Sequence, residues 1–194
     1  MPDDADDLRA RVARLEAGAE IAQLPARYAR AYATMDGPAL GELYAHDTAT
    51  ESQGRGREAI AQRLADTGHG PAGLRTTILH PGGHVIEVDA DDPTTASGHV
   101  HSRAEVERGD GTWYYQAIHY GDRYVFEEGR WRFHGVRDHE LFYGVEHGGA
   151  PNRLPDAHWP ERSVGRGSVP HRWSSWHAWT DGLPHREQTQ PKEQ

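Results

Sequence analysis

Histidine is the residue type with the greatest chemical potential in this sequence. The chain contains 14 histidines and no cysteine. A neutral imidazole can act as a general base or as a metal ligand near neutral pH. The absence of cysteine excludes disulfides, a thiolate nucleophile and cysteine-based zinc or iron–sulfur sites. The composition therefore points to proton transfer or to a metal held by nitrogen and oxygen.

Two groups of histidines have a spacing that metal sites use. His99 and His101 are two residues apart in a β-rich run, so both project from one face of the predicted strand. His134, Asp138 and His139 form a second group further along the chain. Such donors suit zinc, iron or manganese, but neither spacing matches a specific metal motif. We therefore predict no metal, and a metal-dependent reaction is the less favoured alternative.

Other catalytic and binding motifs do not fit. Gly165-Arg166-Gly167 matches neither a phosphate loop nor a dinucleotide fingerprint, and Ser174-Ser175 lacks the context of a nucleophile elbow. The net charge of −9 argues against a nucleic-acid partner, because an acidic surface repels phosphate. No apolar run approaches the ~18 residues of a membrane span, and no signal segment opens the chain. We expect a soluble cytoplasmic protein with no cofactor, nucleic-acid partner or membrane contact.

Helices are expected in the first third of the chain. The spacing of apolar residues predicts a helix over 6–35, with Gly18 as a possible break. Asp36-Gly37-Pro38 ends it, and Pro38 suits the first turn of a short helix over 38–44. A third, amphipathic helix covers 57–64. The apolar positions of the first helix recur at three- and four-residue spacing: Leu8, Val12, Leu15, Ile21, Leu24, Tyr28 and Tyr32.

From residue 84 the apolar period changes from 3.6 to 2, which predicts strands. β-rich runs cover 84–88, 95–106, 114–126 and 131–142. Short turns rich in Asp and Gly separate these runs, so hairpins and an antiparallel sheet follow. Helices followed by a curved meander define an α+β fold, in which the sheet wraps the N-terminal helices as a cone. Such a cone has a cavity for a small, largely apolar ligand.

The composition changes near residue 148 and divides the chain into a domain over 1–147 and an extension over 148–194. The extension is rich in Gly, Pro, Arg and His, yet it contains four of the six tryptophans. Because disordered tails are poor in aromatics, we expect much of 151–180 to pack on the domain or on a neighbouring subunit, with 185–194 frayed. Trp173, Trp176 and Trp179 recur at three-residue spacing, which predicts a short helix that is either a packed interface or a lid.

Three sequence strings in this order resemble the SnoaL-like (nuclear transport factor 2-like) superfamily. They are ARYARAYATMD at 26–36, GREAI at 56–60, and DRY at 122–124 followed by GRWRF at 129–133. The resemblance covers about residues 8–142 and implies the conical α+β fold. Within the superfamily, the chain is most similar to the group of lindane dehydrochlorinase, scytalone dehydratase and bile-acid dehydratase. That group implies lyases without metal that assemble as trimers, with a C-terminal segment closing the pocket.

The resemblance implies a catalytic pair of Asp36 and His80. In the group, an aspartate after the first long helix holds a histidine at the start of the sheet, and that histidine removes a proton from carbon. A carboxylate that accepts from one imidazole nitrogen fixes the tautomer and raises the basicity of the other nitrogen. Tyr28 matches a helix tyrosine of the group and joins the pair as a catalytic residue. The alternative is that Asp36 only ends a turn and His80 is structural.

Two basic positions of the group differ in this chain. The basic residue that some members carry five positions before the aspartate falls on Ala31. The arginine that some place on the last strand falls on Val136, with Arg137 beside it. These differences argue against elimination of chloride in particular.

Strand alternation suggests the supporting residues. By resemblance, the even-numbered face of the 114–126 strand lines the cone, and Tyr120 is a possible acid there. His101 is the candidate second acid, since dehydratases of the group place a histidine on such a strand. Tyr44 is a candidate to orient a substrate oxygen, although core packing is as good an explanation. The residues of the even-numbered face are Gln116, Ile118, Tyr120 and Asp122.

These observations predict a cofactor-independent lyase of dehydratase type, an isomerase or a cyclase that acts on a small hydrophobic ring compound. His80 would abstract the proton, and Tyr28, Tyr120 or His101 would donate one. Ile118, Asp122 and Tyr44 would contact the substrate. The alternative is a non-catalytic small-molecule-binding protein, or a structural subunit like the small subunit of ring-hydroxylating dioxygenases. A homo-oligomer is expected, with a trimer favoured over a dimer.

Overall fold

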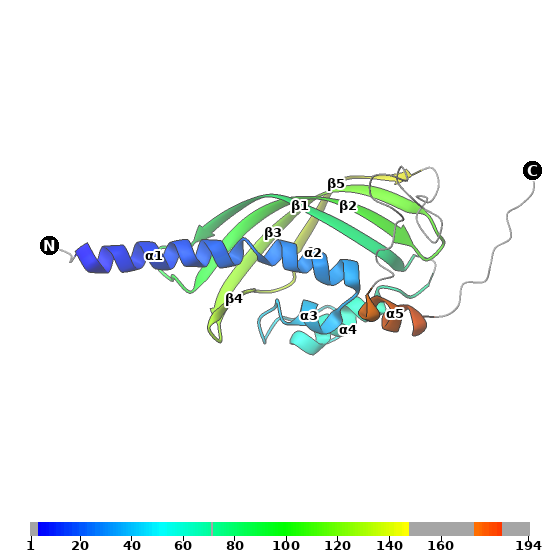
Figure 1. The fold of residues 1–194 in the computed structure, drawn as a ribbon, viewed down its shortest axis with the longest axis horizontal. Helices are drawn as coiled ribbons and strands as arrows, with labels where there is room; N and C mark the ends of the chain where they lie inside the picture. Colours follow the sequence, from blue (N-terminus) through cyan, green and yellow to red (C-terminus); the bar gives the residue numbers. More distant parts are fainter. Residues whose placement is uncertain (1–3, 71, 148–172, 184–194) are drawn as a thin grey trace, which may run out of the picture.

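Helices cover the concave side of a curved, unclosed five-stranded antiparallel sheet in the computed structural model (Figure 1). The structure describes residues 4–70, 72–147 and 173–183. The predicted α+β architecture is therefore confirmed. The elements are α1 (Asp4–Ile21), α2 (Leu24–Thr34), α3 (Gly37–Gly41), α4 (Arg57–Asp66), β1 (Leu74–Val88), β2 (Thr95–Arg108), β3 (Trp113–Glu127), β4 (Arg130–Phe133), β5 (Asp138–His147) and α5 (Ser174–Asp181).

The long N-terminal helix is divided between Ile21 and Leu24, not at Gly18. Gly18 lies inside α1, whereas Pro25 lies at the start of α2. Proline has no N–H to donate, and its ring clashes with the carbonyl four residues earlier, so the break falls just before it. The first half of α1 projects beyond the sheet (Figure 1), and Leu8 is accordingly 58% exposed.

The sheet has the order β1-β2-β3-β4, and β5 also pairs with β3. One end of β3 pairs with β4, and the remainder pairs with β5. The run predicted as a single strand over 131–142 is therefore two strands. The turn between them contains Gly135 with a φ of 83°, a conformation that favours glycine.

β1 begins ten residues earlier than predicted and contains a bulge between Pro81 and His84. Before the bulge, odd-numbered residues such as Leu79 face the concave side. After it, even-numbered residues such as His84 and Ile86 do. One extra residue reverses the face because side chains alternate along a strand.

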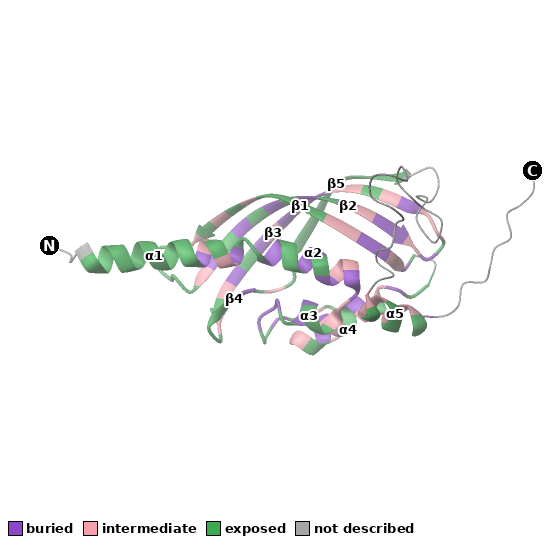
Figure 2. Cartoon of the chain, viewed as in Figure 1, coloured by how far each residue is buried: buried purple, intermediate pink, exposed green. Residues whose placement is uncertain are grey.

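The core lies between the helices and the concave face of the sheet, as the band of buried residues in Figure 2 shows. Ile21 and Leu24 from the helices meet Tyr124 and Phe133 from the strands, and all four are almost fully buried. Burying such a side chain contributes about 1.5–3 kcal/mol each. This contact fixes α2 beneath the sheet.

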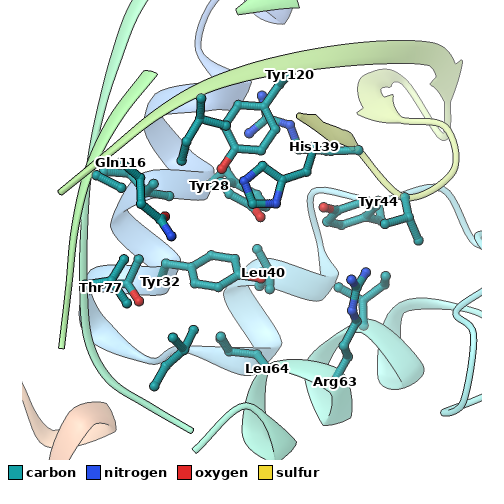
Figure 3. Close-up of a pocket in the computed structure, with 18 residues that line it drawn as sticks. Tyr28, Tyr32, Leu40, Tyr44, Arg63, Leu64, Thr77, Gln116, Tyr120 and His139 are labelled. Atoms are coloured by element: carbon teal, nitrogen blue, oxygen red, sulfur yellow. The ribbon is translucent and has the colours of Figure 1, made fainter. Parts of the chain in front are cut away.

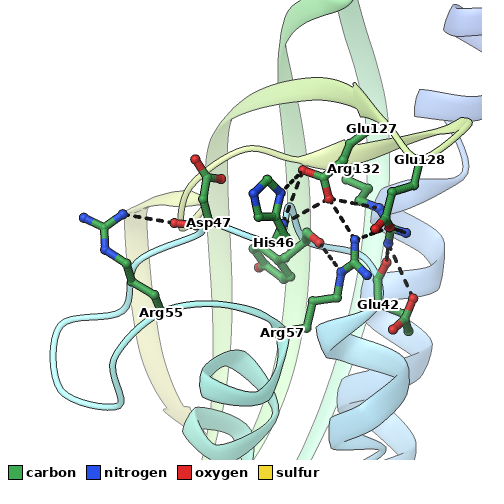
Figure 4. Close-up of polar contacts among 9 residues, drawn as sticks. Glu42, His46, Asp47, Arg55, Arg57, Glu127, Glu128 and Arg132 are labelled. Atoms are coloured by element: carbon green, nitrogen blue, oxygen red, sulfur yellow. Dashed lines mark hydrogen bonds and ion pairs between the residues drawn. The ribbon is translucent and has the colours of Figure 1, made fainter.

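A cluster of charged residues joins the loop before α4 to the β3–β4 hairpin (Figure 4). The Arg57 guanidinium donates to Glu127 at 2.8 Å and to Glu128 at 2.6 Å. Its Nε also donates to the Tyr44 carbonyl at 3.2 Å. The buried Arg132 bonds Glu128 and the backbone carbonyl of Glu42. The cluster therefore positions the backbone of Tyr44 and the start of α4.

The predicted tryptophan helix is present as α5, and it packs against the domain. Trp176 Nε1 donates to the Arg75 carbonyl and Trp179 Nε1 to the Ala65 carbonyl, each at 3.3 Å. Both rings contact the main core. The expectations for 151–172 and for 185–194 fall outside the described residues. Within the part of the chain that the structure covers, no helix is both long and apolar enough to cross a membrane.

Candidate functional site

A cavity of about 240 Å³ lies between α2, α3, α4 and the concave face of the sheet (Figure 3). This volume is slightly below the ~300–1,000 Å³ of typical ligand pockets, so it suits a small ligand. Apolar side chains form much of its wall: Leu40, Ile60, Leu64, Leu74, Leu79 and Ile118. The polar side chains of the wall are Tyr28, Tyr32, Tyr44, Arg63, Thr77, Gln116, Tyr120, Arg137 and His139.

Arg137 is the best-anchored charge of the cavity. Its guanidinium donates to both oxygens of the buried Asp122, at 2.7 and 2.8 Å. Its Cζ lies 3.8 Å from the ring centre of Tyr120 and 4.5 Å from that of Tyr28, so both rings add cation–π contacts. Burial alone would lower the pKa of Arg137, but the Asp122 carboxylate raises it above its usual value. Arg137 therefore stays protonated.

Asp122 receives a third hydrogen bond from behind the cavity wall. The Tyr124 hydroxyl donates to it at 3.0 Å and lies 2.9 Å from His84 Nε2. Burial lowers the pKa of His84, so its ring is neutral at neutral pH. These contacts stabilise the buried carboxylate, which in turn fixes the position of Arg137.

His139 is an exposed residue whose imidazole lines the cavity and is partly covered there. Its ring stacks on Tyr120, with centroids 5.2 Å apart and planes at 19°. Burial lowers the pKa of His139, and the charges of Arg137 and Arg63 lower it further. Neither ring nitrogen bonds another described residue, so a lone pair is available to a ligand.

The tyrosine hydroxyls of the cavity are protonated at neutral pH. Burial raises the pKa of Tyr28 and Tyr44 well above the usual value and raises that of Tyr120 to about 12. The buried Thr77 hydroxyl has no hydrogen-bond partner among the described residues. The cavity therefore combines one neutral base with several weak acids that can donate hydrogen bonds.

The predicted Asp36–His80 pair is not formed. The Asp36 carboxylate caps α3, where it accepts from the Ala39 N–H at 3.0 Å. The His80 side chain is 62% exposed, and a carboxylate oxygen of Glu105 lies 4.0 Å from its Nε2. No hydrogen bond or ion pair joins the two residues, and they line separate hollows outside the cavity. The cause is the alternation of β1, which turns Leu79 inward and His80 outward.

His101 also lies on the outer face of the sheet and not in the cavity. It lines an outer groove with His80. The centroid of its ring lies 5.4 Å from that of His119 and 5.6 Å from that of Phe142. His99 Nδ1 lies 3.1 Å from His119 Nε2 on the same face. Within residues 4–70, 72–147 and 173–183, no three His, Asp or Glu side chains are arranged to hold a metal ion. His101 is thus not placed to serve as the second acid of the cavity.

The other predicted site residues lie at the cavity. Tyr28, Tyr44, Ile118 and Tyr120 line it. Asp122 does not line it but holds Arg137.

Six polar residues of the cavity wall were not predicted as site residues: Tyr32, Arg63, Thr77, Gln116, Arg137 and His139. The position of the group's last-strand arginine falls on Val136, so Arg137 was noted only as its neighbour. His139 was noted only as a metal donor, and Arg63 only as part of a helix. The comparison with the group therefore pointed to this part of the chain, but one residue before Arg137.

The sequence matches the family model of the SnoaL-like domain over residues 13–137. The chain therefore belongs to the SnoaL-like domain family. No curated protein sequence matches the chain.

Solved structures support the same fold. A hexachlorocyclohexane dehydrochlorinase (LinA) of type 2 is 17% identical, with a TM-score of 0.58 over 79% of this chain and 99% of that one. A putative scytalone dehydratase from Novosphingobium aromaticivorans is 18% identical, with a TM-score of 0.56 over 81% and 96% of the two chains. An NTF2-like protein of the same organism is 25% identical, with a TM-score of 0.53 over 73% and 92%.

Proposed function

We propose that the protein is a cofactor-independent enzyme of lyase or isomerase type, which acts on a small hydrophobic ring compound in the cavity. One observation carries the proposal. A neutral imidazole, His139, shares a largely apolar cavity with buried tyrosine hydroxyls and a fixed guanidinium. This set can move a proton from carbon to nitrogen and stabilise the charge that develops on a substrate oxygen.

In the proposed reaction, His139 accepts a proton from a carbon next to a carbonyl group. The C–H electron pair moves toward the carbonyl oxygen, which accepts hydrogen bonds from Tyr28 or Tyr44. For a dehydratase, a hydroxyl on the neighbouring carbon then leaves as water, with a proton from a tyrosine. Transfer of the proton from the imidazolium to that tyrosinate restores both groups. General acid–base catalysis of this kind contributes about 10²–10⁴-fold.

The similar structures support this reaction class. Two of them are named as a dehydrochlorinase and a putative scytalone dehydratase. The expected homo-oligomer is part of the proposal. The exposed side chain of Phe142 on β5, which lines the outer groove with His101, supports self-association through the outer face of the sheet.

Hydrogen exchange at carbon tests the proposal without knowledge of the leaving group. Wild-type protein in D₂O should exchange the α-protons of cyclohexanone or 4-oxocyclohexanecarboxylate, as followed by NMR. His139→Gln should slow this exchange by about 10²–10⁴-fold, because it removes the base. His134→Gln is the matched control, since His134 is exposed and lies outside the cavity. Exchange at the wild-type rate in His139→Gln would contradict the proposal.

A non-catalytic binding protein is the second candidate. The observation that favours it is the missing Asp36–His80 pair, together with the lack of a carboxylate partner for His139 among the described residues. This candidate predicts that the same ketones bind while their α-protons exchange no faster than in buffer.

A further inference from the structure

Arg63 contributes an unmatched positive charge to the cavity. It lies in the last turn of α4 and lines the cavity, and its side chain extends toward Tyr44 in Figure 3. No described carboxylate lies within 4.0 Å of its guanidinium. By contrast, Arg57, Arg132 and Arg137 each have an acidic partner.

The other groups of the cavity wall do not neutralise this charge. None of the lining residues is an aspartate or glutamate. The charge of Arg137 is balanced by Asp122, at 2.7 Å. His139 is neutral, and the tyrosines are protonated. The cavity therefore carries one net positive charge, although the whole chain carries −9.

A structural role explains Arg63 less well. A cation in the last turn stabilises a helix through the helix dipole, and such a side chain can remain in solvent. Arg63 is exposed, but its side chain also lines the cavity, and its charge acts on both Tyr44 and His139. A guanidinium that faces an apolar cavity with no acidic partner is suited to a planar anion.

We infer that the substrate of this cavity is an anionic ring compound whose carboxylate is bound by Arg63, with Tyr44 as a second hydrogen-bond donor. The ring would lie against Leu40, Ile60 and Leu64, on the apolar wall next to α4. The inference rests on the proposed function in that both assign the cavity as the substrate site. It adds the charge class of the substrate and the residue that recognises it.

Matched pairs of ligands test this inference by calorimetry. The probes are cyclohexanecarboxylate with cyclohexanecarboxamide, and benzoate with benzamide, which differ in charge but hardly in shape. Wild-type protein should prefer each carboxylate by about tenfold or more, as expected for a hydrogen bond to a charged group. Raising the salt concentration from about 0.02 M to about 0.3 M should reduce this preference, because Arg63 is exposed.

Variants assign the preference to Arg63. Arg63→Gln should bring the ratio close to one by weakening the carboxylates and leaving the amides unchanged. Arg63→Lys keeps the charge but not the planar fork, so it should keep part of the preference. Arg11→Gln is the matched control, since it removes the same charge from the exposed face of α1.

The outcomes separate this inference from the proposed function. Equal binding of carboxylate and amide by the wild type, or an unchanged preference in Arg63→Gln, would overturn the anionic substrate. The cavity would still be a ligand site in that case, and the exchange experiment would still test its catalysis. Binding of neither class at millimolar concentration would overturn the assignment of the cavity as a substrate site, and the proposed function with it.

Discussion

At the scale of single residues, Arg137 and Asp122 determine the character of the cavity. A buried guanidinium is costly unless it is paired and hydrogen-bonded. Asp122 meets this need with two hydrogen bonds, and the rings of Tyr28 and Tyr120 add cation–π contacts. Because Asp122 holds Arg137 and balances its charge, Arg63 remains as the charge that a ligand can pair with.

The pH dependence of proton abstraction follows from the state of His139. Burial and two arginines lower its pKa below 6.5, and only the deprotonated form accepts a proton. The α-proton exchange rate should therefore rise with pH through that lowered pKa and level off above it. In Arg63→Gln, one of the charges that lower the pKa is lost, so the rise should move to higher pH. A rise at the same pH in Arg63→Gln and wild type would contradict this assignment.

The sequence did not predict which neighbouring residues of β1 and of the segment before β5 face the cavity, and the reason is physical. Side chains alternate along a strand, so an offset of one residue reverses the face. The predicted base His80 lies outside the cavity while its neighbour Leu79 lines it. Likewise, the position of the group's last-strand arginine falls on Val136, whereas the residue that pairs with Asp122 is Arg137. Composition and motif spacing do not resolve such an offset. Tyr28, Tyr44 and Tyr120 do line the cavity, and the roles predicted for them stay predictions.

At the scale of elements, the sequence predicted most of the fold. The periods of 3.6 and 2 predicted α4, β2 and β3 to within one or two residues. They missed the first half of β1 and the division between β4 and β5. The turn at Gly135 and the bulge after Pro81 are local irregularities that interrupt the period of 2. The ends of β1 and β5 are set by their pairing with β2 and β3, which the sequence pattern does not contain.

The docking of α5 can be tested at Gly68. A Cβ atom at this position would lie 2.5 Å from the Trp179 ring and 2.8 Å from Leu183. Gly68→Val should therefore displace α5 and lower the free energy of unfolding by about 1–3 kcal/mol, as measured by denaturant titration. Tryptophan fluorescence should shift to longer wavelength, since Trp179 packs on the core.

A control at Gly70 separates the contact from the backbone. Gly70 has a φ of 73° and nothing within 4 Å of an added Cβ, so Gly70→Ala introduces strain without touching α5. Its tryptophan emission should match the wild type. Unchanged emission and stability in Gly68→Val would show that α5 does not depend on this contact.

At the scale of the whole molecule, the two faces of the sheet have different chemistry. The concave face and the helices enclose the cavity with its tyrosines and arginines. The outer face presents His80, His99 and His101 beside the exposed apolar side chains of β5. The resemblance to the lyase group implied that the catalytic base is His80 on β1, whereas the imidazole that lines the cavity is that of His139 on β5. The predicted trimer and the role of residues 148–172 stay predictions.

The central claim is that proton abstraction occurs in the cavity through His139 and without the Asp36–His80 pair. The most direct measurement is the α-proton exchange rate of 4-oxocyclohexanecarboxylate with the double variant Asp36→Asn and His80→Gln. Asparagine still caps α3 in place of Asp36, so the fold should be retained. We predict exchange within about twofold of the wild type, because both residues lie outside the cavity. A loss of about 10²-fold or more, as expected when a general base is removed, would contradict it.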